Sequence, residues 1–435
     1  MKDLLDWKQS RYRKPLLMTG VRQVGKTWLL KEFGRQSFEN TAYFNFEKDQ
    51  NLAELFESTK DINRIIKTFA IVAGHKIEAQ KTLIILDEIQ ECGEALNALK
   101  YFAEDGPEYH IACAGSLLGV ATARGSGFPV GKVDFLHLNP LTFTEFLLAD
   151  DCQNLVDYLE TLEIVESIPE ILFAQFVDKL KTYFITGGMP ESVKVWTEEH
   201  DVGAVQKILA KILRGYGNDF TKHSDVKDYA KISHIWDSLP SQLSKENKKF
   251  LFRLAREGAR AREYEDALQW LVSAGLASKV YRNNGPTLPI SAGDDLSAFK
   301  LYVVDVGLLR RHAGLAPSVF AKRNELFSVF KGALTENYIL QALVNQYETT
   351  PRYWRVDHPS YEVDFLVQHD NAIVPIEVKA ETNISSKSLK QYLARFGDST
   401  DFGVRFSLMN LRKDGDILNV PLFMADHVKR LIDLQ

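Results

Sequence analysis

Cysteine is scarce in this sequence, and long apolar runs are missing. The 435 residues include 3 cysteines, Cys92, Cys113 and Cys152, whose wide spacing in apolar surroundings excludes a disulfide framework and a zinc knuckle. The histidines show no metal-ligand spacing. No segment approaches the ~20 uninterrupted apolar residues of a membrane span, and the start MKDLLDWKQSRYRKP has no signal-peptide core. We therefore expect a cytoplasmic protein with inert thiols and no membrane partner.

An excess of one charge is also missing. Because 58 acidic residues face 53 basic ones, any contact with nucleic acid must come from a local patch and not from the whole surface. The chain is too long for one ordinary domain, and its apolar content of 45% supports two or three packed cores. Length and composition predict a multidomain protein that is no general polyanion binder, and the alternation of strand and helix patterns described next makes the predicted fold class α/β.

A complete phosphate-binding motif lies near the start. The apolar run RKPLLMTG precedes the loop GVRQVGKT, and the amphipathic segment TWLLKEFGRQ follows it, which is strand, loop and helix. In such a loop, backbone N–H groups converge on phosphates, Lys26 faces the β- and γ-phosphates, and Thr27 offers a hydroxyl to Mg²⁺. The predicted ATP-binding residues are Gly20, Val21, Arg22, Gln23, Val24, Gly25, Lys26, Thr27 and Trp28.

An acidic pair ends the continuous apolar run of KTLIILDEIQEC, which is typical of a central parallel strand. Asp87 at the strand end can hold the Mg²⁺, and Glu88 can polarise the attacking water. The alternative is a strand that simply ends in solvated acids. Since the pair follows a phosphate-binding loop, we favour the catalytic interpretation.

Three further strands complete a predicted five-stranded sheet over residues 1–140: TAYFNFE, YHIACAGS and KVDFLHLNPL. Ser116, at the tip of the fourth strand, can hydrogen-bond the γ-phosphate or the water. This order resembles the P-loop ATPases that insert a strand between the two motifs, including the AAA-type ATPases, in which Ser116 takes the sensor position. The arginine that completes the site stays open among Arg22, Arg124 and Arg214.

A helical lid is expected over residues 141–235, and a winged-helix-like pattern of helix, turn, helix and β-hairpin over 236–310. The second helix carries Glu265 and Asp266, which argues against sequence-specific reading of the major groove. Contact with DNA phosphates and a packing module with a solvated basic face both stay open. The basic residues of this segment are Lys245, Lys248, Lys249, Arg253, Arg256, Arg260 and Arg262.

A family resemblance emerges from motifs that occur in order along nearly the whole chain: GVRQVGKTWLL, LIILDEIQ, AGSLLGV, LNPLTFTEFL, ITGGMPESV, FKLYVVDVGLL, ALTENYI, EVDFLV and PIEVKA. The chain resembles the prokaryotic AAA-type ATPases that carry a C-terminal domain of unknown function with a restriction-endonuclease-like fold. The resemblance implies ATP binding, a winged helix and a PD-(D/E)xK nuclease-like α/β domain over residues 311–435. Gly131-Lys132 departs from the Gly-Arg that is commoner in the family, so no arginine role is assigned there.

A charged hairpin stands in that last region. Residues 361–368 and 373–379 read as strands around an Asp370-Asn371 turn. Glu377 and Lys379 point to one face, and Asp364 can face them from the partner strand. With Glu336 from the helical segment ALTENYILQALV, these residues match the D, E-x-K pattern: two carboxylates for Mg²⁺ or Mn²⁺ beside a lysine that orients or activates water. The alternative is an ion pair on a retained binding scaffold.

Three functions follow. The leading one is an ATP-hydrolysing switch whose nucleotide state controls the winged-helix and nuclease-like region, acting on DNA or a DNA-associated partner. The second is an ATP-regulated, metal-dependent DNA nuclease that uses the four C-terminal residues. The third is a non-catalytic protein that holds nucleotide for structure and binds a partner. A second copy of the chain also stays open as a partner.

Overall fold

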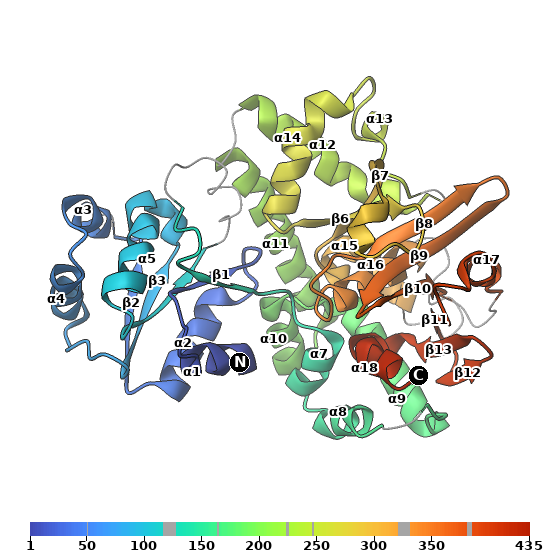
Figure 1. The fold of residues 1–435 in the computed structure, drawn as a ribbon, viewed down its shortest axis with the longest axis horizontal. Coiled ribbons are helices and arrows are strands. Elements are labelled where there is room, and N and C mark those ends of the chain that lie inside the picture. The colour runs from blue at the N-terminus through green and yellow to red at the C-terminus, as the bar shows by residue number, and fades with distance from the viewer. Residues whose placement is uncertain are drawn as a thin grey trace. The chain divides into compact units, whose positions relative to one another are not determined.

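The computed structural model describes residues 1–49, 51–115, 128–162, 165–222, 226–245, 248–320, 331–380 and 385–435 (Figure 1). These residues fall into two compact units. Unit 1 comprises Met1–Asn139 with Ser273–Gly275, and unit 2 comprises Pro140–Val272 with Leu276–Gln435. Among the described helices, none is both long enough and apolar enough to cross a membrane.

Unit 1 contains a parallel five-stranded sheet in the order β2-β3-β4-β1-β5. This confirms the predicted parallel sheet, and β4 lies between the strand before the phosphate-binding loop and the strand that ends in the acidic pair. The strands are β1 (Leu16–Thr19), β2 (Asn40–Asn45), β3 (Thr82–Asp87), β4 (His110–Ala114) and β5 (Asp134–His137).

Helices cover both faces of this sheet. Alternate residues of β3 enter two different cores: Ile84 and Leu86 pack with α3, α4 and α5, whereas Leu83 and Ile85 pack with α1 and α2. The unbroken apolar run of β3 is therefore the consequence of burial on two sides. The helices are α1 (Lys2–Gln9), α2 (Lys26–Ser37), α3 (Asn51–Ser58), α4 (Ile62–Ala73), α5 (Gly93–Asp105) and the 3₁₀ turn η1 (Ile89–Glu91).

Unit 2 begins as the helical region that the sequence predicts and continues into a mixed region. Its helices are α7 (Phe143–Ala149), α8 (Gln153–Glu160), α9 (Glu170–Thr186), α10 (Pro190–Glu199), α11 (Val202–Lys222), α12 (Val226–Leu243), α13 (Phe252–Ala255), α14 (Ala261–Ser273), α15 (Val306–His312), α16 (Lys331–Leu343), α17 (Lys387–Phe396) and α18 (Val428–Asp433). Its 3₁₀ turns are η2 (Ile290–Gly293), η3 (Pro317–Phe320) and η4 (Leu422–His427).

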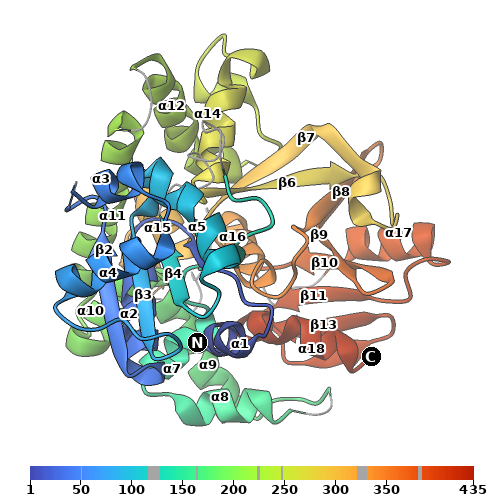
Figure 2. The same cartoon turned by 60° about the vertical axis from the view of Figure 1, so that its left-hand side comes forward.

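An eight-stranded mixed sheet runs through unit 2 in the order β12-β13-β11-β10-β9-β8-β6-β7 (Figure 2). Strand β6 pairs with β8, so the hairpin expected as the wing of residues 236–310 continues the sheet of the region after residue 310. The strands are β6 (Ala277–Asn283), β7 (Asp294–Val303), β8 (Arg352–Asp357), β9 (Ser360–His369), β10 (Ala372–Val378), β11 (Gly403–Ser407), β12 (Arg412–Asp414) and β13 (Ile417–Pro421).

Two of the ordered sequence motifs meet inside unit 2. The buried carboxylate of Asp305 accepts hydrogen bonds from the backbone N–H of Gly188 at 2.6 Å and of Leu308 at 2.8 Å, and from the Gln341 side chain at 3.4 Å. A Cβ on Gly187 would clash with Asp305, and its φ of +66° also favours glycine. The motifs ITGGMPESV and FKLYVVDVGLL thus hold each other through buried hydrogen bonds.

Candidate active sites

The phosphate-binding loop joins β1 to α2 and adopts backbone angles that need glycine. Gly20 has φ +142° and Gly25, the residue before α2, has φ +98°. A Cβ on Gly20 would also clash with the Leu138 carbonyl. Val21 and Val24 are buried, so the loop presents its backbone and not these side chains to a ligand. The loop glycines therefore permit the close backbone approach that phosphate binding requires.

Lys26 is folded back onto its own loop. Its ammonium donates hydrogen bonds to the carbonyls of Gly20 at 2.7 Å and Val21 at 2.8 Å, and the residue is 7% exposed. Burial lowers the pKa of Lys26 to about 8, although Glu88 and Asp87 act in the opposite direction. The lysine is thus held within the loop by two carbonyl contacts that a phosphate group can replace.

Asp87 is the centre of a hydrogen-bonded cluster. Its carboxylate accepts from the Thr27 hydroxyl at 3.0 Å, the Tyr43 hydroxyl at 2.7 Å and the Asn45 amide at 3.3 Å. Burial and the contact with Asp87 raise the pKa of Tyr43 to about 12. The sequence analysis missed Tyr43 and Asn45. Their signal is the alternation of TAYFN, which puts both side chains on one face of β2 where Asn45 pairs with Asp87.

Glu88 directly follows the end of β3 in a left-handed conformation, with φ +52° and ψ +42°. Such a conformation is uncommon for a residue other than glycine and is enriched at functional sites. The Gln90 amide donates to the Glu88 carboxylate at 2.6 Å. Gln90, which the sequence analysis did not select, thus orients the predicted general base.

The other predicted residues of the ATP site have different surroundings. Trp28 is 69% exposed on the first turn of α2, and Arg22 is close enough to Lys26 to disfavour its charged form. Ser116 and Arg124 lie outside the described residues. Arg214 lies on α11 in unit 2.

Strands β9 and β10 form the predicted hairpin of the C-terminal region, with Asp370 and Asn371 between them. The pairing of Ile376 with Phe365, continued by one residue, sets Glu377 opposite Asp364 on the same face. The Lys379 ammonium lies 3.0 Å from Glu377 Oε1. Burial lowers the pKa of Lys379, but Glu377 and Asp364 outweigh it and raise the pKa overall. The D, E-x-K residues are therefore neighbours.

Asp364 and Glu377 differ in how their oxygens are satisfied. Asp364 Oδ2 accepts from the Val378 backbone N–H at 2.8 Å. Glu377 is 1% exposed, and its Oε2 has no hydrogen-bond partner in the described part of the chain. Burial and the nearby Glu336 raise the pKa of Asp364 well above its usual range.

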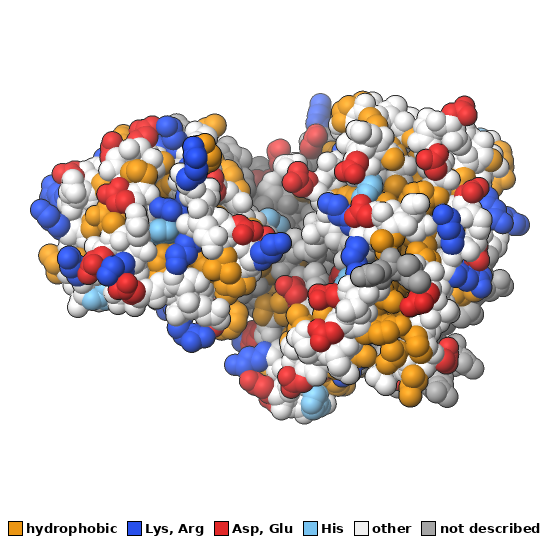
Figure 3. Space-filling view, turned by 60° about the horizontal axis from the view of Figure 1, so that its bottom comes forward, with side chains coloured by type: hydrophobic (Ala, Val, Ile, Leu, Met, Phe, Trp, Pro, Cys, Tyr) orange, Lys and Arg blue, Asp and Glu red, His pale blue; other side chains and the backbone are white. Residues whose placement is uncertain are grey.

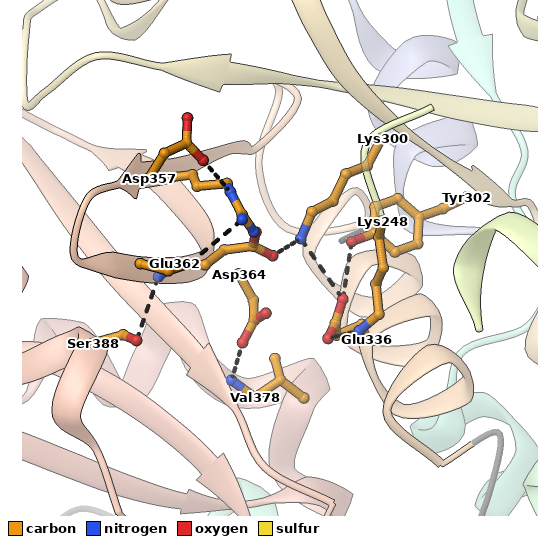
Figure 4. A network of polar contacts seen from close by, with 11 residues as sticks. Lys248, Lys300, Tyr302, Glu336, Asp357, Glu362, Asp364, Val378 and Ser388 are labelled. Atoms are coloured by element: carbon orange, nitrogen blue, oxygen red, sulfur yellow. Dashed lines mark hydrogen bonds and ion pairs between the residues drawn. The ribbon is translucent and has the colours of Figure 1, made fainter. Parts of the chain in front are cut away.

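Glu336, on α16, has more cationic partners than the sequence predicts. Lys248 makes an ion pair with Oε1, the Tyr302 hydroxyl donates to Oε2 at 3.1 Å, and Lys300 lies 4.0 Å from Oε2 (Figure 4). Burial opposes the ionisation of Glu336, but Lys248 and Lys300 outweigh it, and the pKa of Glu336 lies below its usual value. Glu336 is thus an anion whose charge is already neutralised.

The same cluster extends to a carboxylate that the sequence analysis passed over. Glu362 accepts from the buried Lys300 ammonium and, at 2.9 Å, from the Arg355 guanidinium. A lysine in the apolar strand FKLYVV and the alternation of Glu362 with Asp364 in YEVDF were the available signals, because a buried charge needs a partner. Lys300 therefore links Glu336 on the helix to Glu362 on the sheet.

The basic segment is largely exposed, but Lys248 is not part of its outer face. Its side chain is 13% exposed and points to Glu336. The exposed members of the segment are Lys245, Arg253, Arg256, Arg260 and Arg262, and Lys249 is half-buried. The local positive patch is therefore smaller than the sequence suggests.

The oxygen-rich donors of both clusters suit Mg²⁺ or Mn²⁺ by ligand type. Within the described ranges, no group of three or more histidine, cysteine, aspartate or glutamate side chains is arranged to hold a metal ion. At the C-terminal cluster, Glu377 Oε2 is buried and has no hydrogen-bond partner among the described residues, so this oxygen is the one best suited to coordinate a cation. In unit 1 the corresponding pair is Thr27 with Asp87.

Comparison with protein families divides the chain into three matched regions. Residues 12–147 match the family described as an AAA domain. Residues 177–319 match a domain of unknown function (DUF8612), and residues 331–423 match another (DUF4143). No curated protein matches the sequence.

Several solved structures show low overall similarity to the chain. The Walker-type ATPase PABY2304 of Pyrococcus abyssi is 13% identical, with 72% of this chain and 94% of that chain covered and a TM-score of 0.45. The RuvB Holliday junction branch migration motor of Thermotoga maritima is 14% identical. The match covers 63% of this chain and 85% of that chain, with a TM-score of 0.27. C. elegans PCH-2 is 13% identical. The match covers 45% of this chain and 61% of that chain, with a TM-score of 0.24.

These overall similarities are low, so the assignment of unit 1 depends on the family match and on its geometry. Residues 12–147 match the AAA domain, and the same residues contain the parallel five-stranded sheet and the glycine-dependent loop before α2. Residues 12–147 therefore match an AAA domain in sequence and have the sheet and loop of a P-loop nucleotide-binding domain, which supports ATP as a ligand of this unit.

Proposed function

We propose that this protein is an ATP-hydrolysing switch whose nucleotide state controls its C-terminal region, which acts on DNA or a DNA-associated partner. The observation that supports ATP hydrolysis most is the hydrogen bond from Thr27 to Asp87, because it joins the phosphate-binding loop to the acidic pair. The proposed division is an ATPase core (1–140), a helical lid (141–235), a winged-helix-like region (236–310) and a nuclease-like region (311–435).

Hydrolysis would use the residues of the loop and of the end of β3. The loop N–H groups and Lys26 bind the phosphates, and Lys26 exchanges the carbonyls of Gly20 and Val21 for phosphate oxygens. Thr27 and Asp87 would hold Mg²⁺, which supplies charge neutralisation for the phosphates. Glu88 accepts a proton from the attacking water, and Gln90 orients its carboxylate.

Two substitutions separate binding from hydrolysis. Glu88→Gln keeps the shape of the side chain but removes the base, so we expect ATP to remain bound while hydrolysis slows by at least about a hundredfold. Lys26→Ala removes the charge that faces the phosphates, so nucleotide binding is lost. Phosphate release and equilibrium binding of a fluorescent ATP analogue measure the two effects. Normal turnover by Glu88→Gln would assign the base elsewhere, and tight binding by Lys26→Ala contradicts the proposed loop function.

A second function, a metal-dependent DNA nuclease, is favoured by the C-terminal cluster. Asp364 faces Glu377 across the hairpin, Lys379 contacts Glu377, and Glu377 Oε2 lacks a partner among the described residues. Asp364 and Glu377 would hold Mg²⁺ or Mn²⁺, which supplies a Lewis acid for phosphodiester hydrolysis. Lys379 keeps its proton and orients the attacking water by hydrogen bonding.

Plasmid nicking tests this second function. With Mn²⁺ or Mg²⁺, with and without ATP, we expect the wild-type protein to nick supercoiled DNA, and Asp364→Asn and Lys379→Met to lose nicking. Both variants should keep the wild-type rate of phosphate release from ATP, which shows that they fold. Absence of nicking by the wild type under all of these conditions makes the cluster a retained binding scaffold.

A further inference from the structure

Both carboxylate oxygens of Glu336 have donors within the C-terminal cluster. The Lys248 ammonium pairs with Oε1, and the Tyr302 hydroxyl and the Lys300 ammonium approach Oε2 (Figure 4). Glu336 is 5% exposed, so this ion pair is formed inside the protein and not on its surface. An incoming cation would therefore have to displace a donor from Glu336.

Lys248 is held in this place by the residues that follow it. The Phe250 N–H donates to the Phe299 carbonyl at 2.8 Å, and the two rings stack with centroids 5.4 Å apart. The Leu251 N–H donates to the Gln242 side chain at 2.7 Å. Because the chain is anchored to β7 and α12 on one side of Lys248, its contact with Glu336 is a built feature and not the chance position of a surface lysine.

Asp364 and Glu377 present the opposite situation. Glu377 Oε2 is buried and lacks a hydrogen-bond partner in the described ranges, and Asp364 Oδ2 accepts a hydrogen bond from the backbone N–H of Val378. Glu377 uses its other oxygen for Lys379. The capacity to bind a cation is thus concentrated on two of the three carboxylates.

We propose that Lys248 is an internal counter-ion that occupies Glu336 in place of a divalent cation, so that the cation site uses two carboxylates while Lys248 is in place and three when it leaves. The inference rests on the metal site proposed above. Divalent cations bind more tightly as the number of charged oxygen ligands rises. Lys248 therefore sets the affinity of the site, and displacement of the basic segment frees the third ligand.

A double-mutant cycle tests the proposal on the nucleotide-free, full-length protein with Mn²⁺ alone. Bound Mn²⁺ is measured by the loss of the free-ion electron paramagnetic resonance signal. We expect Lys248→Met to bind Mn²⁺ at least about tenfold more tightly than the wild type, because the site gains a charged oxygen ligand; a tenfold change corresponds to about 1.4 kcal/mol. The gain must disappear in Lys248→Met/Glu336→Gln, because the freed carboxylate is absent there.

Three further variants make the outcomes distinguishable. Lys245→Met removes an exposed lysine of the same segment and should bind Mn²⁺ as the wild type does. Lys248→Gln replaces the charge by a neutral donor and should bind more tightly than the wild type, which covers the case that the methionine variant folds poorly. Asp364→Asn should lose the site. Equal affinity of the wild type, Lys248→Met and Lys248→Gln, with loss in Asp364→Asn, overturns the counter-ion role but leaves the metal site. An unchanged Asp364→Asn overturns both.

Discussion

At the scale of single residues, the carboxylate of Asp87, the ligand proposed for Mg²⁺, is held in place by three hydrogen-bond donors. Thr27, Tyr43 and Asn45 all donate to it, and the residue is 4% exposed. Donors of this kind fix the direction of a ligand, and their loss usually weakens metal binding or activity by about ten- to a hundredfold. Tyr43 makes the shortest of these contacts, at 2.7 Å.

Tyr43→Phe therefore has a specific expected effect. The phenyl ring keeps its place, including its cation–π contact with Lys31 at 3.6 Å, but the donor to Asp87 is lost. We expect the Mg²⁺ concentration for half-maximal ATP hydrolysis to rise about tenfold, with nucleotide binding in the absence of Mg²⁺ unchanged. Steady-state ATP hydrolysis at a series of Mg²⁺ concentrations measures this Mg²⁺ requirement. Tyr101→Phe, on α5, serves as the control, and an unchanged Mg²⁺ requirement in Tyr43→Phe contradicts a positioning role.

Individual site residues could be predicted where their spacing in the sequence alone decides which way their side chains point. Glu377 and Lys379 are two apart on a strand, and the structure brings their charged groups to 3.0 Å. The direction of Lys248 could not be predicted, since it lies in a basic segment that reads as a solvated face, and its partner is 88 residues away. Charge in a sequence shows that a partner is needed, but the fold decides which one.

At the scale of elements, local patterns were sufficient for strands and turns. The buried run of β3 and the two-residue turn between β9 and β10 fall where the sequence predicts them. In both cases the signal is contained in fewer than about ten neighbouring residues, as strand alternation and turn chemistry require.

The pairing between strands that are distant in the sequence could not be predicted from local patterns. Arg282 and Asn283 of β6 pair with Tyr353 and Trp354 of β8, and nothing in either segment alone specifies the other. Strands β6 and β7 form a hairpin where the wing was predicted, but one sheet joins this hairpin to the region after residue 310, so the winged helix stays a prediction. This pairing brings Lys300 of β7 to the same cluster as Glu362 of β9, so the C-terminal site includes residues from both predicted regions.

At the scale of the whole molecule, charge is balanced and the candidate partner surface is local. On the face drawn in Figure 3, acidic and basic side chains alternate, as a net charge of -5 from 53 basic and 58 acidic residues leads one to expect. Long-range attraction of DNA is weak for such a surface, and affinity must come from a few phosphate contacts. In the proposed complex with DNA, the exposed arginines at 253, 256, 260 and 262 would supply four of these contacts.

The proposed switch makes a prediction that does not depend on the path between the ATP site and the C-terminal region. If ATP changes the affinity for DNA by some factor, DNA must change the affinity for ATP by the same factor, because binding free energies are reciprocal. Glu88→Gln combined with Asp364→Asn keeps both ligands intact during the measurement. We expect a change of at least about fivefold, the lower end of usual allosteric coupling. Fluorescence anisotropy of a labelled duplex and of a labelled nucleotide, at one salt concentration with Mg²⁺, gives the two factors.

The control for this experiment is the same protein with Lys26→Ala, in which ATP should leave the affinity for DNA unchanged because the nucleotide no longer binds. Two equal factors well above one support control of the C-terminal region by nucleotide. If ATP does not change the affinity for DNA and DNA does not change the affinity for ATP, the switch is contradicted even when ATP is hydrolysed. A ligand that binds two conformational states with equal affinity does not shift the equilibrium between them. A duplex that binds with neither nucleotide state contradicts DNA as the partner, and the exposed arginines then belong to a solvated face of a packing module, the alternative that their sequence had left open.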